Sequence, residues 1–281
     1  MNIQWYPGHM TKTKRMMQAN MNLVDVVIEL LDARIPYSSK NPDMDELAKH
    51  KKRLILLNKS DLADPELTRK WSDYYQSKGF ATLAISATEK KIAGKLAETV
   101  RRMMFDKIAK EKARGRLTVN IRAMVAGIPN VGKSTLINQL SGGSPTTVGD
   151  KPGVTRGKQW IKVAKDFDLL DTPGVLWPKF EDQAVGEKLA FTGAINDVIL
   201  DLITLSEMLI AWLLTEKPAA IPTRYKLNHD LPDSPREILE AIAKARGFKL
   251  KGGGIDLERA ANTLLDEFRA GRLGRISLES P

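Results

Sequence analysis

The stretch Gly127-Ile128-Pro129-Asn130-Val131-Gly132-Lys133-Ser134 decides the fold. Four residues separate its two glycines and Lys-Ser follows the second, which is the P-loop pattern. An apolar run, Arg122–Ala126, precedes it and a helical pattern, Lys133–Leu140, follows it, as this motif requires. Glycines let backbone N–H groups turn toward phosphate oxygens, and the helix N-terminus adds positive potential there. We therefore predict a phosphate-binding loop between a strand and a helix.

The residues of this loop have expected roles in binding a nucleotide. Lys133 would neutralise the β- and γ-phosphates, and the Ser134 hydroxyl would bind Mg²⁺. The remaining loop residues expected to contact the nucleotide are Asn130, Val131, Gly132 and Thr135.

A second motif, Asp171-Thr172-Pro173-Gly174, ends another apolar run further along the chain. In P-loop proteins an aspartate at this place holds Mg²⁺, and the N–H of the glycine, here Gly174, can sense the γ-phosphate. The polar segment between the two motifs contains Thr155, which we expect to complete the Mg²⁺ ligands with Ser134 and Asp171. Thr146 and Thr147 are the competing candidates for that role.

A third motif, Asn58-Lys59-Ser60-Asp61, follows the apolar run Arg53–Leu57 and predicts a guanine site. The Asp61 carboxylate can accept hydrogen bonds from N1–H and the exocyclic amine of guanine. Adenine offers no such pair, and an unpaired carboxylate is costly to bury, so this site favours GTP over ATP. Asn58 would brace the loop and touch the base, and the Lys59 stem would cover the face of the base. Ser86 and Ala87, after the next strand, would present a backbone N–H to guanine O6.

The order of these motifs is permuted. Ras-like GTPases place the P-loop first and the base motif later, whereas here the base motif comes first. Apolar runs alternate with helical patterns through residue 177, which predicts an α/β domain with a parallel sheet. The expected strands are Leu23–Leu31, Arg53–Leu57, Ala81–Ile85, Arg122–Ala126, Gln159–Val163 and Asp166–Leu170. The expected helices are Thr11–Met21, Asp43–His50, Glu66–Lys78, Lys91–Phe105 and Lys133–Leu140.

Residues 178–281 differ in character from residues 1–177. Their apolar spacing is helical, which predicts a small all-helical C-terminal domain after the permuted GTPase domain. The expected helices there lie near Val198–Leu214, Pro235–Arg246 and Asp256–Arg269. The most apolar segment, Ala194–Leu214, contains three acidic residues, so we expect no membrane span.

Composition excludes several classes of protein. Of the 281 residues, 42% are apolar and 28% charged, which is the balance of a folded chain rather than a disordered one. The absence of cysteine excludes disulfides, thiolate zinc sites and cysteine nucleophiles.

The net charge of +10 is concentrated in the first domain. Residues 1–177 hold 30 lysines and arginines against 18 acidic residues, whereas residues 178–281 hold 14 against 16. We interpret this basic face as a site of nucleic-acid contact, and a solvated helix face is the alternative. The basic residues gather in two places: Lys12, Lys14 and Arg15, and the stretch 101–122.

The motif set resembles the ribosome biogenesis GTPase A family, the YlqF/RbgA type. The residues that carry the resemblance span nearly the whole chain: Trp5–Met10, Asp32-Ala33-Arg34-Ile35-Pro36, Asn58–Asp61, Gly127–Ser134, Asp171–Gly174 and Gly271–Gly274. The resemblance implies GTP-dependent late maturation of the large ribosomal subunit and a helical domain that helps to bind ribosomal RNA. It further implies GTP and Mg²⁺ as ligands, and a K⁺ ion held by Asn130 beside the phosphates.

The resemblance also bears on partners and on location. We expect a monomeric, cytoplasmic protein whose turnover is stimulated by the precursor particle, with neither DNA nor a membrane as partner. The N-terminal motif Trp5–Met10 leaves no room for an organellar presequence in the sequence given.

One catalytic group is missing from the usual place. Val175 stands where many GTPases have a glutamine that orients the attacking water, and valine cannot do this. His9, expected in a short loop after Pro7 and Gly8, is the candidate substitute. A structural loop histidine is the alternative that composition alone favours, and the resemblance reverses that preference.

Two functions compete on the sequence alone. The first is a conditional GTPase that acts on ribosomal precursors, and the second is a GTP-dependent RNA-binding module in which hydrolysis is incidental. An RNA-modifying enzyme with GTP as a switch is disfavoured, because no motif for a second cofactor is visible.

Overall fold

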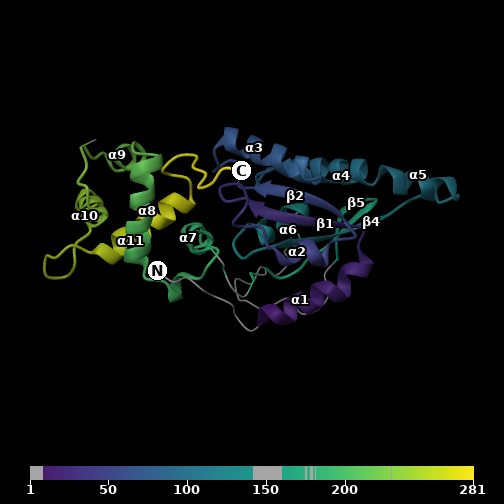
Figure 1. Ribbon diagram of the computed structural model, residues 1–281, viewed down its shortest axis with the longest axis horizontal. Coiled ribbons are helices and arrows are strands. Elements are labelled where there is room, and N and C mark those ends of the chain that lie inside the picture. Colours follow the sequence, from purple (N-terminus) through teal and green to yellow (C-terminus); the bar gives the residue numbers. More distant parts are fainter. Residues whose placement is uncertain (1–8, 142–159, 175, 178–179, 181, 229) are drawn as a thin grey trace. The chain divides into compact units, whose positions relative to one another are not determined.

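A computed structural model describes residues 9–141, 160–174, 176–177, 180, 182–228 and 230–281 (Figure 1). Side chains are described from Thr13 onward. The chain divides into two compact units, one of Gln4–Lys179 with Ser277–Pro281 and the other built on Phe180–Ile276. This division differs from the expected boundary after residue 177, because the last five residues belong to the first unit.

The first unit is built on one sheet, as predicted. Within the described ranges the strand order is β3-β2-β1-β4-β6-β5, and neighbours are parallel except for the antiparallel pair β5–β6. The strands are β1 Val26–Asp32, β2 Lys52–Asn58, β3 Ala81–Ala84, β4 Ile121–Gly127, β5 Trp160–Ala164 and β6 Phe167–Leu170. They match the six predicted strands to within a few residues.

The register of the central strands positions the functional motifs. All seven residues of β1 are buried, as expected for a parallel strand covered on both faces. Asp32 pairs with Asn58 on β2, and Leu30 pairs with Gly127 on β4. Since parallel strands end at the same edge, the loops after β1, β2 and β4 emerge together, which is where ligands bind in open α/β sheets.

The helices of the first unit follow the predictions with two corrections. They are α1 His9–Asn20, α2 Asp43–Leu47, α3 Pro65–Ser77, α4 Ile92–Met103, α5 Phe105–Ala113 and α6 Lys133–Leu140. The prediction that His9 lies in a short loop was wrong, because α1 begins at His9. The single helix expected over Lys91–Phe105 breaks at Met104 and is followed by α5.

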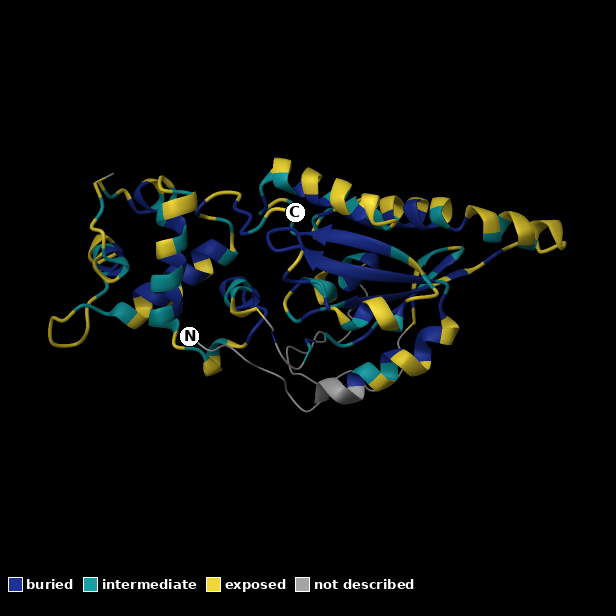
Figure 2. Cartoon of the chain, in the orientation of Figure 1, coloured by how far each residue is buried: buried dark blue, intermediate teal, exposed yellow. Residues whose placement is uncertain are grey.

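Helix α5 was missed because its few apolar residues, among them Phe105, Ile108 and Ala109, lie within the basic stretch 101–122. None of its residues is buried, and Phe105 is 69% exposed. Figures 1 and 2 show it extending beyond the strands as a solvent-exposed arm. Such a helix has little packing to stabilise it.

The second unit is helical, as predicted. Its α-helices are α7 Gln183–Phe191, α8 Leu202–Glu216, α9 Ala220–Tyr225, α10 Pro235–Ala245 and α11 Leu257–Arg269. Helices α8, α10 and α11 pack on one another. Inside this unit Glu267 accepts hydrogen bonds from Arg224 at 2.6 and 2.9 Å and from Arg246 at 2.9 Å. The Arg224 hydrogen bonds lower the pKa of Glu267 to about 2, although burial opposes the shift. No helix in the described part of the chain is long and apolar enough to cross a membrane.

The C-terminal residues Ser277–Pro281 return to the first unit and bind the turn after β1. The Leu278 N–H donates to the Arg34 carbonyl at 2.8 Å. The Glu279 carboxylate accepts from the backbone N–H groups of Tyr37 and Ser38 and from the Ser38 hydroxyl. The indole N–H of Trp71 on α3 donates to the Glu279 carbonyl at 3.1 Å. The tail therefore fastens this turn to α3.

Glu279→Ala should loosen that turn. Removing the carboxylate leaves two backbone donors and a hydroxyl without their acceptor, and we expect the first unit to lose about 1–2 kcal/mol of unfolding free energy. Urea denaturation measures the loss, and hydrogen exchange of the amides of Tyr37 and Ser38 should accelerate at the same time.

Glu98→Ala is the matched control, because Glu98 is an exposed residue of α4 in the same unit. Equal stability and equal amide protection in the two variants would show that the tail contributes nothing to holding the turn.

Candidate functional site

The phosphate-binding loop joins β4 to α6. The backbone takes left-handed φ values of 57° at Asn130 and 95° at Gly132. A Cβ on Gly132 would lie 2.4 Å from Nδ2 of Asn58, so only glycine fits there. Lys133 is the first residue of α6, and Ser134 and Thr135 lie exposed in its first turn. The backbone N–H groups at this helix end have the geometry that binds phosphate.

The Asp171–Gly174 segment lies against this loop. Lys133 Nζ and Asp171 Oδ1 form an ion pair of 2.9 Å. A Cβ on Gly174 would lie 3.0 Å from the backbone nitrogen of Pro129, so the two loops touch. The Thr172 hydroxyl donates to the Val125 carbonyl of β4 at 2.7 Å and anchors the segment. A bound magnesium nucleotide would give both members of the ion pair new partners, phosphate for Lys133 and the metal for Asp171.

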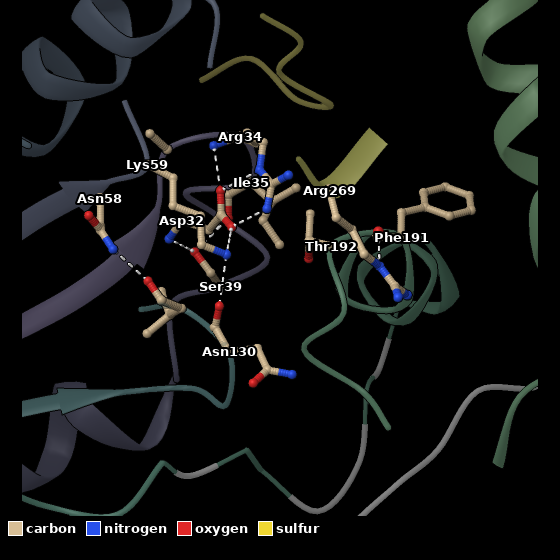
Figure 3. A network of polar contacts seen from close by, with 12 residues as sticks. Asp32, Arg34, Ile35, Ser39, Asn58, Lys59, Asn130, Phe191, Thr192 and Arg269 are labelled. Atoms are coloured by element: carbon tan, nitrogen blue, oxygen red, sulfur yellow. Dashed lines mark hydrogen bonds and ion pairs between the residues drawn. The ribbon is translucent and has the colours of Figure 1, made fainter. Parts of the chain in front are cut away.

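The base motif binds the phosphate loop directly (Figure 3). Asn58 Nδ2 donates to the Val131 carbonyl at 2.7 Å, and Lys59 Nζ donates to the Asn130 carbonyl at 2.7 Å. Two neighbouring side chains thus hold two consecutive carbonyls of the loop. Asp61 stays exposed and is accessible to a base.

The Ser86–Thr88 segment is tied to the same motif. The Ala87 N–H donates to Asn58 Oδ1 at 2.9 Å, and the Ser60 N–H donates to the Ile85 carbonyl at 3.0 Å. The Ala87 N–H is therefore engaged within the protein. A contact from this segment to guanine O6 would use a neighbouring N–H group.

Several predicted site residues lie outside the described residues. Thr155 is one of them, together with its competitors Thr146 and Thr147 and the position Val175. For His9 the structure describes only the backbone, at the start of α1. The remaining predicted residues meet at the carboxyl edge of the sheet: Asn58, Lys59, Asp61, Ser86, Ala87, Asn130, Val131, Gly132, Lys133, Ser134, Thr135, Asp171 and Gly174.

Sequence reasoning assigned no role to Asp32 and Arg34, although their motif supported the family resemblance. Asp32 ends β1 with its side chain only 3% exposed, and Arg34 and Lys59 both bind its carboxylate. The one signal available was the position of an acidic residue at the end of a buried strand, next to the base motif.

The chain is similar to known proteins over almost its whole length. Residues 122–228 match the model of a family described as "50S ribosome-binding GTPase". Ribosome biogenesis GTPase A of Bacillus cereus is 46% identical over 281 residues, which cover 100% of this chain and 95% of the relative. Mitochondrial ribosome-associated GTPase 1 of Mus musculus is 34% identical, with 98% and 90% of the two chains covered.

Solved structures agree with these relatives. A GNP-bound YlqF from Thermotoga maritima matches with a TM-score of 0.67 and 26% identity, covering 96% of this chain and 98% of that one. A GDP-bound YlqF structure gives the same TM-score and identity. The permuted motif order, the sheet topology and these full-length similarities agree, so this chain belongs to the ribosome biogenesis GTPase A family of P-loop GTPases.

Proposed function

We propose that this chain binds and hydrolyses GTP as an assembly factor for the large ribosomal subunit, acting late in maturation in the cytoplasm. The observation that carries the nucleotide part is the direct attachment of the base motif to the phosphate loop through Asn58 and Lys59. One rigid unit then recognises both the base and the phosphates. The relatives supply the ribosomal part, since they are ribosome biogenesis GTPases.

The residues fit a magnesium nucleotide. Lys133 and the first turn of α6 supply positive charge and N–H donors for the phosphates, and Asp61 supplies the acceptor for guanine. Ser134, Asp171 and Thr155 are the proposed Mg²⁺ ligands, and hydroxyl and carboxylate oxygens suit that ion. When bound, Mg²⁺ would neutralise charge that develops on the phosphates during hydrolysis.

A polar group must orient the attacking water, because Val175 cannot. We assign this role to His9 at the start of α1, since an imidazole nitrogen can accept a hydrogen bond from water. Docking on a ribosomal particle would bring the residue into place, so hydrolysis would depend on the particle.

The charge of the first unit suits ribosomal RNA as the partner of a monomeric chain. The arm α5 carries Lys110 and Lys112 on a helix without buried residues, whereas its Lys107 pairs with Asp25. Some basic residues nearby are paired within the protein, such as Arg101 with Asp166 at 2.6 Å, so the charge available to RNA is smaller than composition suggests. The helical unit, which is slightly acidic overall, would add contacts that depend on RNA shape.

Asp61→Asn should change the preference of the site from guanine to xanthine. The amide N–H introduced by this substitution would meet the N–H donors of guanine, whereas xanthine offers a carbonyl oxygen in place of the exocyclic amine. We expect GTP affinity to fall about 100-fold and the affinity for xanthosine triphosphate to rise, as measured by competition with a fluorescent nucleotide. Asp73→Asn, on the exposed face of α3, is the control. Unchanged guanine preference in Asp61→Asn would show that Asp61 does not read the base.

A K⁺ ion beside Asn130 should make turnover faster in KCl than in NaCl at equal ionic strength, because the cation would offset negative charge at the β–γ bridge. Asn130→Gly should erase the difference. Glycine tolerates the left-handed backbone of this position and keeps the carbonyl that Lys59 binds. Equal turnover rates of the unaltered protein in KCl and NaCl would contradict the proposed K⁺ site.

Purified large subunits should stimulate GTP turnover several-fold, with binding that weakens as salt rises. His9→Ala should bind GTP and the particle normally but lose most of the stimulated turnover, with kcat falling about 100-fold and KM changing little.

His50→Ala is the matched control, because His50 is an exposed histidine of the same unit. Normal stimulated turnover of His9→Ala would show that His9 is structural. Absence of stimulation in the unaltered protein would favour the alternative, a GTP-dependent RNA-binding module in which hydrolysis is incidental.

A further inference from the structure

We propose that Asp32 and Arg34 are positioning residues of the nucleotide site: Asp32 holds the Lys59 amine on the Asn130 carbonyl, and Arg34 holds Asp32. The Lys59 hydrogen bond from the base motif to the phosphate loop would then form only while the buried ion pair between Asp32 and Arg34 is intact. The inference rests on the proposed GTP site and adds two residues that do not touch the nucleotide.

The Asp32 carboxylate binds two cations at once (Figure 3). Its Oδ2 lies 2.7 Å from Nη2 of Arg34 and 2.9 Å from Nζ of Lys59. Its Oδ1 accepts from Nε of Arg34 at 2.9 Å and from the Arg34 backbone N–H at 3.0 Å. The geometry of the Arg34 contact is bidentate, which fixes the carboxylate in direction as well as position.

The positive charges of Arg34 and Lys59 keep the Asp32 carboxyl group ionised, which is the form that attracts the Lys59 ammonium group. Burial alone would raise the pKa of Asp32, but Arg34 and Lys59 outweigh it and hold that pKa well below its usual range. The neighbouring backbone is fixed too. The Asp32 N–H donates to the Ser39 hydroxyl at 3.0 Å, and that hydroxyl donates to the Ile35 carbonyl at 2.7 Å. The anchor is therefore ionised and rigid.

Lys59 connects this anchor to the phosphate loop. Its backbone has a left-handed φ of 58°, and its Nζ reaches both Asp32 Oδ2 at 2.9 Å and the Asn130 carbonyl at 2.7 Å. A lysine side chain is flexible, and holding one in a single geometry costs conformational entropy. A fixed carboxylate on one side offsets that cost, so the amine stays on the Asn130 carbonyl.

The structure offers an internal comparison on the same two strands. Glu29 on β1 is also buried, with its side chain 2% exposed, and it pairs with Arg53 on β2 at 2.5 Å. This second pair lies three residues earlier along β1, away from the carboxyl edge. Like Asp32, Glu29 pairs with an arginine, but among the bonds described it does not contact Lys59. A change at Glu29 therefore disturbs a buried ion pair on the same strands without removing a partner of Lys59.

Asp32→Asn is the primary test, and the rate of fluorescent GDP dissociation is the readout. We expect dissociation about 10- to 100-fold faster, because the carbonyl contact of Lys59 loses its support. The KM for GTP should rise, while kcat at saturation changes little. Glu29→Gln should dissociate GDP at the rate of the unaltered protein.

A double-mutant cycle tests whether Asp32 acts through Lys59. If it does, adding Asp32→Asn to Lys59→Met should change dissociation by less than about twofold beyond Lys59→Met alone. If Asp32→Asn does not fold, because it leaves the Arg34 guanidinium buried without its carboxylate, Asp32→Asn combined with Arg34→Met removes that charge and still deprives Lys59 of its partner.

Two results would overturn the proposal. Either Asp32→Asn dissociates GDP no faster than Glu29→Gln, or its effect adds in full to that of Lys59→Met. A failure of the GTP site itself is distinguishable, because Asp61→Asn and Lys59→Met would then both leave guanine-nucleotide affinity unchanged.

Discussion

Two hydrogen bonds from the base motif to the phosphate loop determine how this nucleotide site is arranged. Asn58 and Lys59 bind the carbonyls of Val131 and Asn130, which are adjacent in the chain. The register of the sheet makes this possible, because β2 and β4 flank β1 and all three end at one edge. The base motif and the phosphate loop are therefore joined by two hydrogen bonds to one backbone segment, and under the proposed function a disturbance of either motif would reach the other through them.

The parts of the fold that the sequence predicted are those set by local chemistry. A P-loop requires a strand before it and a helix after it, so the motif Gly127–Ser134 predicted the positions of both β4 and α6. The base motif located the end of β2 in the same way, and buried parallel strands appear as apolar runs that need no partner to be recognised. The family and the helical character of the second unit follow from the same local signals.

The missed features depend on contacts between distant residues, or lack a pattern. Nothing near Glu279 in the sequence shows that its carboxylate binds Tyr37 and Ser38, since that contact joins opposite ends of the chain. The predicted strand ended at Leu31, one residue before Asp32, and the contact of Asp32 with Lys59 depends on the pairing of β1 with β2, which Lys59 directly follows. Helix α5 follows α4 after one residue, Met104, and no glycine or proline in the sequence marks the break between them.

Permutation changes what the ends of the chain can do. In the usual motif order the segment after Asp-x-x-Gly returns to the sheet, whereas here it leads into the helical unit. The C-terminal residues then re-enter the first unit, where Leu278 binds the Arg34 carbonyl. The helical unit is thus covalently joined to the GTPase unit twice: after the segment that holds Asp171, and beside the turn that holds Asp32. These are the residues that contact Lys133 of the phosphate loop and Lys59 of the base motif. Under the proposed function, a particle bound to the helical unit would therefore have two covalent routes to the nucleotide site, one on the Asp171 side and one on the Asp32 side.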